Sequence, residues 1–237
     1  MDEGTAARLR TQMVDRQLRR RGVRDEAVLQ AMGRVPRERF VPPQYEADAY
    51  RDEALGIEAG QTISQPYIVA RMTELLAPAP GRRILEVGTG SGYQAAILAE
   101  IGCRVLSIER HEELAAAAGA LIAELGYGES VRIVVGDGSL GRPQDAPYDG
   151  IVVTAAAPRI PPSLIGQLAE GGRIVIPVGT RQLQQMIVCI RHGEKLEVTR
   201  GEGCVFVPLV GAEGFAPDGA ESQRESILQR AFGRKIS

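Results

Sequence analysis

The sequence LEVGTGSGYQ, residues 85–94, carries glycines at the alternate positions 88, 90 and 92. It continues an apolar run typical of a buried strand, and a helical pattern follows it to residue 102. Glycine allows a tight turn and a close approach of the backbone to a ligand, and the first turn of a helix presents unpaired N–H groups. We therefore expect a ligand crevice where this strand meets its helix.

Strand and helix patterns alternate from residue 82 onward. Short apolar runs predict strands at residues 82–88, 104–109, 131–137, 148–156 and 173–179. Helical patterns lie between them at residues 93–102, 111–126 and 161–172. This alternation is typical of α/β proteins in which helices cover both faces of a mostly parallel sheet. The sequence thus predicts a doubly wound sheet.

The C-terminal part has a different pattern. Residues 184–200 predict a hairpin with a glycine-containing turn, and residues 203–211 predict one further strand. We therefore expect antiparallel strands at one edge of the sheet. Residues 216–237 are expected to form a tail, with a short amphipathic helix at 227–232, whose role the sequence does not assign.

A helical part is expected before the sheet. Residues 5–33 show a helical apolar stripe with a break at Gly22, whereas residues 34–60 are rich in proline, glycine and charge and are expected to be irregular. Another helix is predicted from Pro66, because proline is favoured in a first turn, to Leu76. The expected parts are an N-terminal helical and lid part (1–68), a core that contains the sheet (69–215) and the tail (216–237).

The composition fits a globular protein with one core and a small accessory part. The chain has 237 residues, 44% hydrophobic and 24% charged, with a formal net charge of -2. This charge, with 4% aromatic residues and no tryptophan, argues against a nucleic-acid partner. No apolar run follows the initiating methionine or could span a bilayer, so we expect neither a signal peptide nor a membrane partner.

Cysteine and histidine are scarce. The three cysteines, Cys103, Cys189 and Cys204, form no CxxC pair, which favours reduced thiols in a cytoplasmic protein. The two histidines, His111 and His192, are interpreted as surface residues. Because metal sites and catalytic triads usually depend on histidine, we expect neither. We also expect a monomer.

Three acidic residues at the ends of successive predicted strands indicate the ligand of the glycine loop. The spacing GxGxG is tighter than the GxGxxG of dinucleotide-binding loops, and Glu86 would repel a pyrophosphate but suit a cation. Glu109 is placed to accept both hydroxyls of an adenosine ribose. Asp137 could accept from an adenine amino group. S-adenosylmethionine, which carries a sulfonium, an ammonium and an adenosine, is the ligand that these acids favour.

Four motifs resemble the protein-L-isoaspartate O-methyltransferase family, from about residue 10 to residue 215. They are TISQPYIVA (62–70), LEVGTGSGYQAA (85–96), YDGIVVTAAAP (148–158) and GGRIVIPVG (171–179). The resemblance implies the class I methyltransferase fold and S-adenosylmethionine as methyl donor, with S-adenosylhomocysteine as product. It implies as acceptor the free α-carboxylate of an L-isoaspartyl residue in a damaged protein or peptide. The methyl ester would then close to a succinimide, which reopens partly to normal aspartate.

The resemblance also implies site residues. The family's active-site serine corresponds to Ser64. Its cofactor-binding positions correspond to Gln61, Thr62, Ile63, Gly88, Thr89, Gly90, Ser91, Gly92, Glu109, Asp137 and Gly138. This chain departs from the family at two places, because many members have histidine in place of Tyr67 and some have threonine in place of Val210. A histidine-dependent role at position 67 and a hydroxyl contact at position 210 are therefore not expected.

The expected chemistry agrees with these residues. A carboxylate has an ordinary pKa of about 4, so it is ionised at neutral pH and needs no strong base to accept a methyl group. Catalysis would consist mainly in positioning the reactants and excluding water. Ser64 could orient one carboxylate oxygen, whereas capping of the next helix is the alternative interpretation. The small residues of 153–164 either leave room for a peptide backbone or pack against the next helix.

Three other functions remain open on the sequence. A related O-methyltransferase could tailor a dedicated ribosomal peptide, which the unassigned tail leaves open. A nicotinamide-dependent oxidoreductase is disfavoured by the GxGxG spacing and by the lack of an obvious Tyr/Lys pair. A non-catalytic cofactor-binding or interaction protein is the third. Binding of S-adenosylmethionine against NAD, together with methyl transfer to an isoaspartyl peptide, would separate them.

Overall fold

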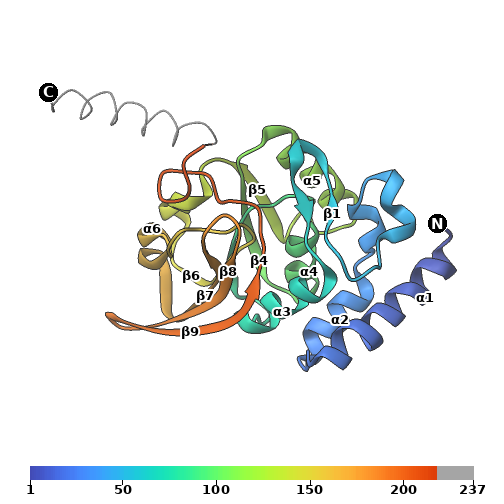
Figure 1. Ribbon diagram of the computed structural model, residues 1–237, viewed down its shortest axis with the longest axis horizontal. Coiled ribbons are helices and arrows are strands. Elements are labelled where there is room, and N and C mark those ends of the chain that lie inside the picture. Colours follow the sequence, from blue (N-terminus) through green and yellow to red (C-terminus); the bar gives the residue numbers. More distant parts are fainter. Residues whose placement is uncertain (218–237) are drawn as a thin grey trace, which may run out of the picture.

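A seven-stranded sheet forms the centre of the computed structural model, which describes residues 1–217 (Figure 1). The strand order is β5-β4-β3-β6-β7-β8-β9. The strands are β3 (Arg83–Val87), β4 (Arg104–Glu109), β5 (Val131–Val135), β6 (Tyr148–Val153), β7 (Leu168–Gly179), β8 (Gln184–His192) and β9 (Lys195–Cys204). β3 to β7 pair in parallel, whereas β8 and β9 are antiparallel to their neighbours. The predicted doubly wound sheet with antiparallel edge strands is confirmed.

Each face of the sheet carries an apolar core, because successive residues of a strand point to opposite faces. Ile84 and Val105 belong to one core, on which α3 and α4 pack. Leu85 and Leu106 belong to the other, which includes Leu164 of α6. The central strands are therefore buried on both faces. The helices of the core are α3 (Pro66–Leu76), α4 (Tyr93–Glu100), α5 (Glu112–Glu124) and α6 (Pro162–Gly166).

The N-terminal part is helical, as predicted. α1 (Glu3–Met13) continues through a π-helical turn (Val14–Leu18) and a 3-10 turn (Arg19–Arg21). This helical run ends at Gly22, whose φ of 97° is the left-handed conformation that glycine adopts readily. α2 (Glu26–Arg34) follows and packs against α3 and α4, which joins the N-terminal part to one face of the core (Figure 1).

The segment between α2 and α3 is irregular, as predicted, but it contains a small sheet that the sequence did not predict. β1 (Leu55–Gly56) pairs antiparallel with β2 (Thr62–Ile63). α3 then begins at Pro66 and ends at Leu76, in agreement with the expected bounds. Three 3-10 turns also lie in this segment, at Arg37–Phe40, Pro43–Asp48 and Glu58–Gly60.

The helix predicted over residues 161–172 is shorter in the structure. α6 ends at Gly166 and β7 begins at Leu168. The N–H of Tyr148 donates to the carbonyl of Gln167 at 2.9 Å, and Tyr148 lies opposite Leu168 in the sheet. Pairing with β6 therefore ends the helix, and the local sequence of α6 carries no sign of that distant partner.

The strand predicted over residues 203–211 is also wrong. β9 ends at Cys204, and the chain then crosses to the end of β6. There Ala156 N donates to Val207 O at 2.8 Å, and Leu209 N donates to Ala156 O at 2.7 Å. This contact is an isolated parallel bridge between Ala156 and Pro208. The helix expected at residues 227–232 lies outside the described residues.

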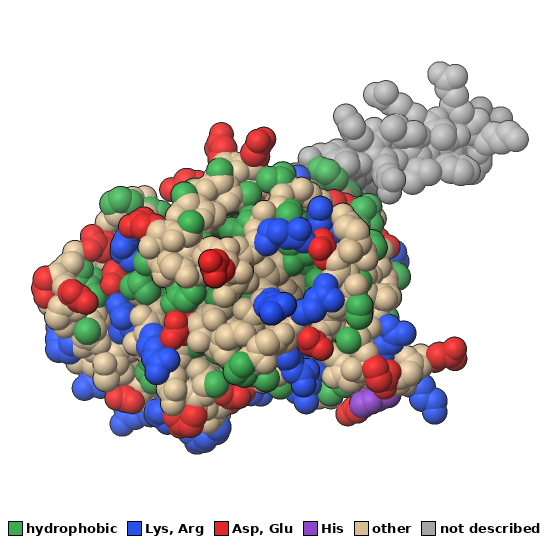
Figure 2. Space-filling view, turned by 180° about the vertical axis from the view of Figure 1, so that it is seen from behind, with side chains coloured by type: hydrophobic (Ala, Val, Ile, Leu, Met, Phe, Trp, Pro, Cys, Tyr) green, Lys and Arg blue, Asp and Glu red, His purple; other side chains and the backbone are tan. Residues whose placement is uncertain are grey.

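The surface mixes charges of both signs. Figure 2 shows basic and acidic side chains interspersed on the face opposite to the view of Figure 1. All three cysteines are free and buried. Within residues 1–217 no helix is long and apolar enough to cross a membrane, and no group of three or more His, Cys, Asp or Glu residues could hold a metal ion.

Candidate active site

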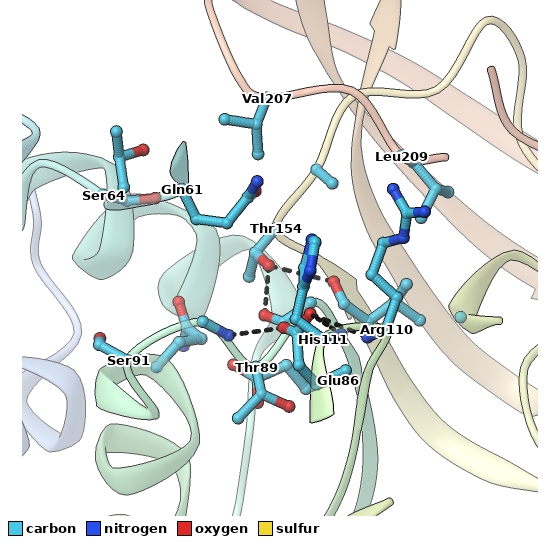
Figure 3. A pocket seen from close by; sticks show the side chains of 18 of the residues that line it. Gln61, Ser64, Glu86, Thr89, Ser91, Arg110, His111, Thr154, Val207 and Leu209 are labelled. Carbon is cyan, nitrogen blue, oxygen red and sulfur yellow. Dashed lines mark hydrogen bonds between the residues drawn. The ribbon is translucent and has the colours of Figure 1, made fainter. Parts of the chain in front are cut away.

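A pocket of about 410 Å³ opens at the carboxyl ends of β3, β4 and β6 (Figure 3). Its wall combines the glycine loop after β3, the residues that end β4, and residues 59–64 before α3. The start of the loop after β6 and residues 207–210 complete it. Doubly wound sheets bind their ligands at the carboxyl ends of the strands, and the volume of this pocket suits a small organic molecule.

The glycine loop is held against the end of β6 by a hydroxyl group. Thr154 Oγ1 donates to Val87 O at 3.0 Å and to Gly88 O at 2.5 Å. Gly88 has a φ of 95°, and a Cβ there would lie 2.4 Å from Thr154 Oγ1. A side chain at position 88 is therefore excluded by both backbone conformation and space. The loop can turn sharply here because residue 88 is glycine.

Glu109, at the end of β4, is locked by backbone N–H groups. Its Oε2 accepts from Gly90 N at 3.0 Å. Its Oε1 accepts from Arg110 N at 2.8 Å and from His111 N at 3.0 Å. These bonds hold an anion at the wall of the pocket and stabilise its charge. Because a carboxylate offers about four acceptor positions, Glu109 can still accept from a ligand.

Glu86 lies in the wall of the pocket and is fully buried. Its Oε2 accepts from Ser107 Oγ, which lies 2.5 Å from Thr89 Oγ1. Its Oε1 has no hydrogen-bond partner among the described residues. Burial, together with the nearby charge of Glu109, raises the pKa of Glu86 to about 8, against the lowering effect of the Ser107 hydrogen bond. A cationic group beside Oε1 would favour the ionised carboxylate.

The raised pKa of Glu86 should make the stability of the free chain depend on pH. An unfolded glutamate has a pKa of about 4.3, so between that value and about pH 8 the folded chain holds a proton that the unfolded chain has lost. The free energy of unfolding therefore falls as the pH rises through this window. Urea unfolding should show that the free energy of unfolding of the wild type is lower at about pH 8 than at about pH 5. In Glu86→Gln this decrease should be smaller by about 1 kcal/mol or more. Equal falls in both proteins would contradict the raised pKa.

Residues 61–64, which include β2, form the wall opposite the glycine loop. Figure 3 shows Gln61 and Ser64 on one side of the pocket and Ser91 of the glycine loop on the other. The carbonyl of Ser64 accepts from Arg37 Nη2 at 2.8 Å, whereas Ser64 Oγ has no hydrogen-bond partner in the described part of the chain. α3 begins after Gln65 and has no side-chain cap there. The alternative interpretation of Ser64 as a helix cap is therefore wrong.

A second pocket, of about 360 Å³, adjoins the first. Thr62, Ser64, Thr154 and Val207 line both pockets, so they form a shared wall. Other lining residues of the second pocket include Arg21, Gln65, Tyr67, Glu202 and Phe206.

Tyr67 joins the two sides of the second pocket. The guanidinium of Arg21, from the N-terminal part, lies 3.5 Å from the centre of the Tyr67 ring. Tyr67 OH donates to Glu202 Oε2, near the end of β9, at 3.3 Å. Tyr67, at which no histidine-dependent role is expected, therefore packs between the N-terminal part and β9.

Most residues predicted for the site meet in the first pocket. It is lined by Gln61, Thr62, Ile63, Ser64, Glu86, Gly88, Thr89, Gly90, Ser91, Glu109 and Gly138. Gly92 and Asp137 do not line it. Gly92, with a φ of 86°, leads into α4, and a Cβ there would lie 3.3 Å from Ala118 Cβ.

Asp137 is engaged by the protein itself. Its Oδ1 accepts from the backbone N and the Oγ of Ser139, at 2.9 Å and 2.7 Å. Its Oδ2 accepts from Ala212 N at 2.7 Å. Asp137 thereby fastens the C-terminal segment that follows the pocket residues 207–210. A contact from Asp137 to an adenine amino group stays a prediction, and it would have to share these oxygens.

Several lining residues were not among those predicted for the pocket. His111 was interpreted as a surface residue, yet it lines the pocket beside Arg110, directly after β4. Thr154 likewise follows β6. Residues that follow parallel strands meet at one edge of a sheet, so their positions were a usable signal. The strand pattern gave no sign that residues 207–210 reach the pocket, because they do so through the unpredicted crossing to β6, and only the family resemblance had drawn attention to position 210.

The fold is that of the class I S-adenosylmethionine-dependent methyltransferases. Its marks are the strand order of the sheet and a pocket at the strand ends, with the glycine loop after β3 and an acid at the end of β4. Residues 9–214 match the family model described as protein-L-isoaspartate(D-aspartate) O-methyltransferase. The chain belongs to this family, which confirms the resemblance of its motifs.

Curated relatives and a solved structure resemble the chain over most of its length. The protein-L-isoaspartate O-methyltransferase of Koribacter versatilis is 52% identical over 208 residues, 88% of this chain and 93% of the relative. That of Methanoregula boonei is 54% identical over 206 residues, 87% of this chain and 94% of the relative. A solved structure of a protein-L-isoaspartate O-methyltransferase is 30% identical with a TM-score of 0.77, over 91% of this chain and 69% of that one.

Proposed function

We propose that this protein transfers the methyl group of S-adenosylmethionine to the free α-carboxylate of L-isoaspartyl residues in damaged proteins and peptides. The observation that carries the proposal is the place of Ser64 in the wall shared by two adjoining pockets. One pocket has the groups that a charged nucleoside donor requires, and the other lies where a peptide can approach Ser64. The names of the relatives support the same activity.

The first pocket, termed the donor pocket, would hold S-adenosylmethionine. Glu109 would accept from the ribose hydroxyls, and the unpartnered Oε1 of Glu86 suits a cationic group of the donor. Residues 88–92 would follow the donor closely, because glycine exposes the backbone, and Gly138 lines the same pocket. Residues 61–63 would cover it from the opposite side. The bound donor supplies a methyl group made electrophilic by the positive sulfur.

The second pocket, termed the acceptor pocket, would hold the isoaspartyl residue. Methyl transfer to its α-carboxylate would need the carboxylate held beside the methyl group and water excluded, which the residues of the shared wall would provide. No proton has to be removed, because the carboxylate is already ionised. Ser64 Oγ, which has no other partner in residues 1–217, would donate to the second carboxylate oxygen and orient the first.

The activity can be tested with a matched pair of peptides that differ only in an isoaspartyl or a normal aspartyl residue. Transfer of labelled methyl from S-adenosylmethionine should occur to the isoaspartyl peptide and be at least about 100-fold slower to its twin, since only the former presents a flexible α-carboxylate beside the methyl group. Equal rates would overturn the repair function. Failure with several isoaspartyl peptides would point to a dedicated peptide substrate instead.

The setting of the enzyme is also part of the proposal. We propose that it acts as a monomer in the cytoplasm, with isoaspartyl proteins or peptides as its partners and without binding nucleic acid or membranes. Three free, buried cysteines fit a reducing compartment, and interspersed surface charges fit weak attraction to polyanions (Figure 2). Residues 1–68 would serve as the lid part over the core of residues 69–215.

A further inference from the structure

Arg37 is a fully buried arginine in the N-terminal part of the chain. Among the described residues its guanidinium forms no ion pair with a carboxylate, and its Nη1 has no hydrogen-bond partner. The negative charge of Asp52 acts on the guanidinium only from beyond ion-pair distance. Because burying a charge without a close ion pair is costly, the contacts that Arg37 does make need a specific explanation.

The contacts of Arg37 lead to the junction of the two pockets. Nε donates to Ala49 O at 2.7 Å, and Nη2 donates to Ser64 O at 2.8 Å. The guanidinium carbon lies 4.9 Å from the centre of the ring of Tyr93, which lines the donor pocket. Phe40, in the same 3-10 turn as Arg37, packs against that ring with 5.3 Å between centroids. One side chain thus touches the backbone of Ser64 and the wall of the donor pocket.

We propose that Arg37 is a positioning residue for methyl transfer, which holds Ser64 at the junction of the donor and acceptor pockets through its carbonyl. This inference rests on the proposed function. Ser64 lies between β2 and α3, outside both, and its hydroxyl has no anchor in the described residues. The bond from Arg37 is therefore the direct restraint on its backbone.

The shape of the guanidinium explains why the residue is arginine. Nε and Nη2 belong to one rigid planar group, so the carbonyls of Ala49 and Ser64 are held at a fixed separation. The flat face of the same group can lie against the ring of Tyr93. Lysine carries one ammonium group on a flexible chain, and its three rotatable N–H donors would not hold the two carbonyls at a fixed separation. The spacing between Ser64 and the donor wall would then loosen.

The test compares Arg37→Lys, Arg37→Ala and the wild type in methyl transfer to an isoaspartyl peptide. We expect kcat per folded molecule to fall about 10- to 100-fold in both variants, because small displacements of a positioning group have effects of this size. The dissociation constant of S-adenosylhomocysteine, measured by calorimetry, should change less than about threefold. Guanidinium chloride at about 20 mM, far below the molar concentrations that unfold proteins, should restore part of the kcat of Arg37→Ala but not of Arg37→Lys.

Arg10→Lys is the matched control. The Arg10 side chain is 14% exposed and donates to Tyr50 OH and Glu38, and it lines neither pocket. The Arg10→Lys protein should be less stable than the wild type but should keep the wild-type kcat per folded molecule. The role of Arg37 is overturned if Arg37→Lys keeps the wild-type kcat, or if guanidinium does not rescue Arg37→Ala. An inactive wild type would instead overturn the proposed function, so the two failures are distinguishable.

Discussion

Replacing Ser64 by alanine is expected to lower the rate of methyl transfer about 100-fold without unfolding the protein. A hydrogen bond to a charged group contributes about 1.5–3 kcal/mol, which corresponds to roughly 10- to 150-fold in rate. The substitution should cost little stability, because within residues 1–217 the hydroxyl makes no hydrogen bond and does not cap α3. The measurement is kcat with saturating donor and isoaspartyl peptide, alongside a thermal melt.

The control for this prediction is Ser130→Ala. Ser130 lies just before β5, at the edge of the sheet away from the two pockets, and lines neither of them. Its variant should keep the wild-type rate. A Ser64→Ala protein with wild-type kcat would remove the hydroxyl from the mechanism. A fall in rate that merely follows a fall in melting temperature would show a structural effect.

Replacing Glu109 by glutamine should weaken donor binding by about 30- to 100-fold. The carboxylate accepts from three backbone N–H groups, of Gly90, Arg110 and His111. A glutamine side chain has one oxygen acceptor and an NH₂ group, so at least one of these N–H groups would face a donor. The glycine loop would lose a hydrogen bond to residue 109, and the ribose would lose an acceptor. Together these losses would lower the binding free energy by about 2–3 kcal/mol. Calorimetric titration with S-adenosylhomocysteine measures the change.

Glu112→Gln provides the comparison for Glu109→Gln. Glu112 is exposed in the first turn of α5, and its charge contributes only a modest interaction with the helix dipole. Its variant should bind S-adenosylhomocysteine as the wild type does. If Glu109→Gln also kept its affinity within about twofold, the proposed role of Glu109 in ribose binding would fail, because even one charge-assisted hydrogen bond contributes more.

The parts of the fold that follow from local patterns could be predicted from the sequence. The strand and loop around residues 85–92 and the helix from Pro66 to Leu76 were correct, since apolar periodicity and proline placement act over a few residues. The end of α6 and the course of residues 205–210 were not, because they depend on Tyr148 and Ala156, which are distant in sequence.

The candidate site divides in the same way. Glu86 and Glu109 were found because each lies at the end of a parallel strand, where the topology brings such residues together. The hydrogen bond from Arg37 to the carbonyl of Ser64 was not predicted, because the sequence does not mark which arginine is buried. The hydrogen bond from Ala212 N to Asp137 was also not predicted. Every residue other than proline has a backbone N–H group, so the sequence does not mark this donor either.

The wall shared by the two pockets has a consequence for inhibitor design. In the described part of the chain, the residues that line both cavities are Thr62, Ser64, Thr154 and Val207, so a ligand in one cavity would lie beside a ligand in the other. A single molecule that joins a thioether nucleoside to an isoaspartyl mimic through a short tether would occupy both cavities. Its second half would bind at a high effective concentration, so its affinity would exceed that of either half. The tether should lie at the position of the methyl carbon that is transferred.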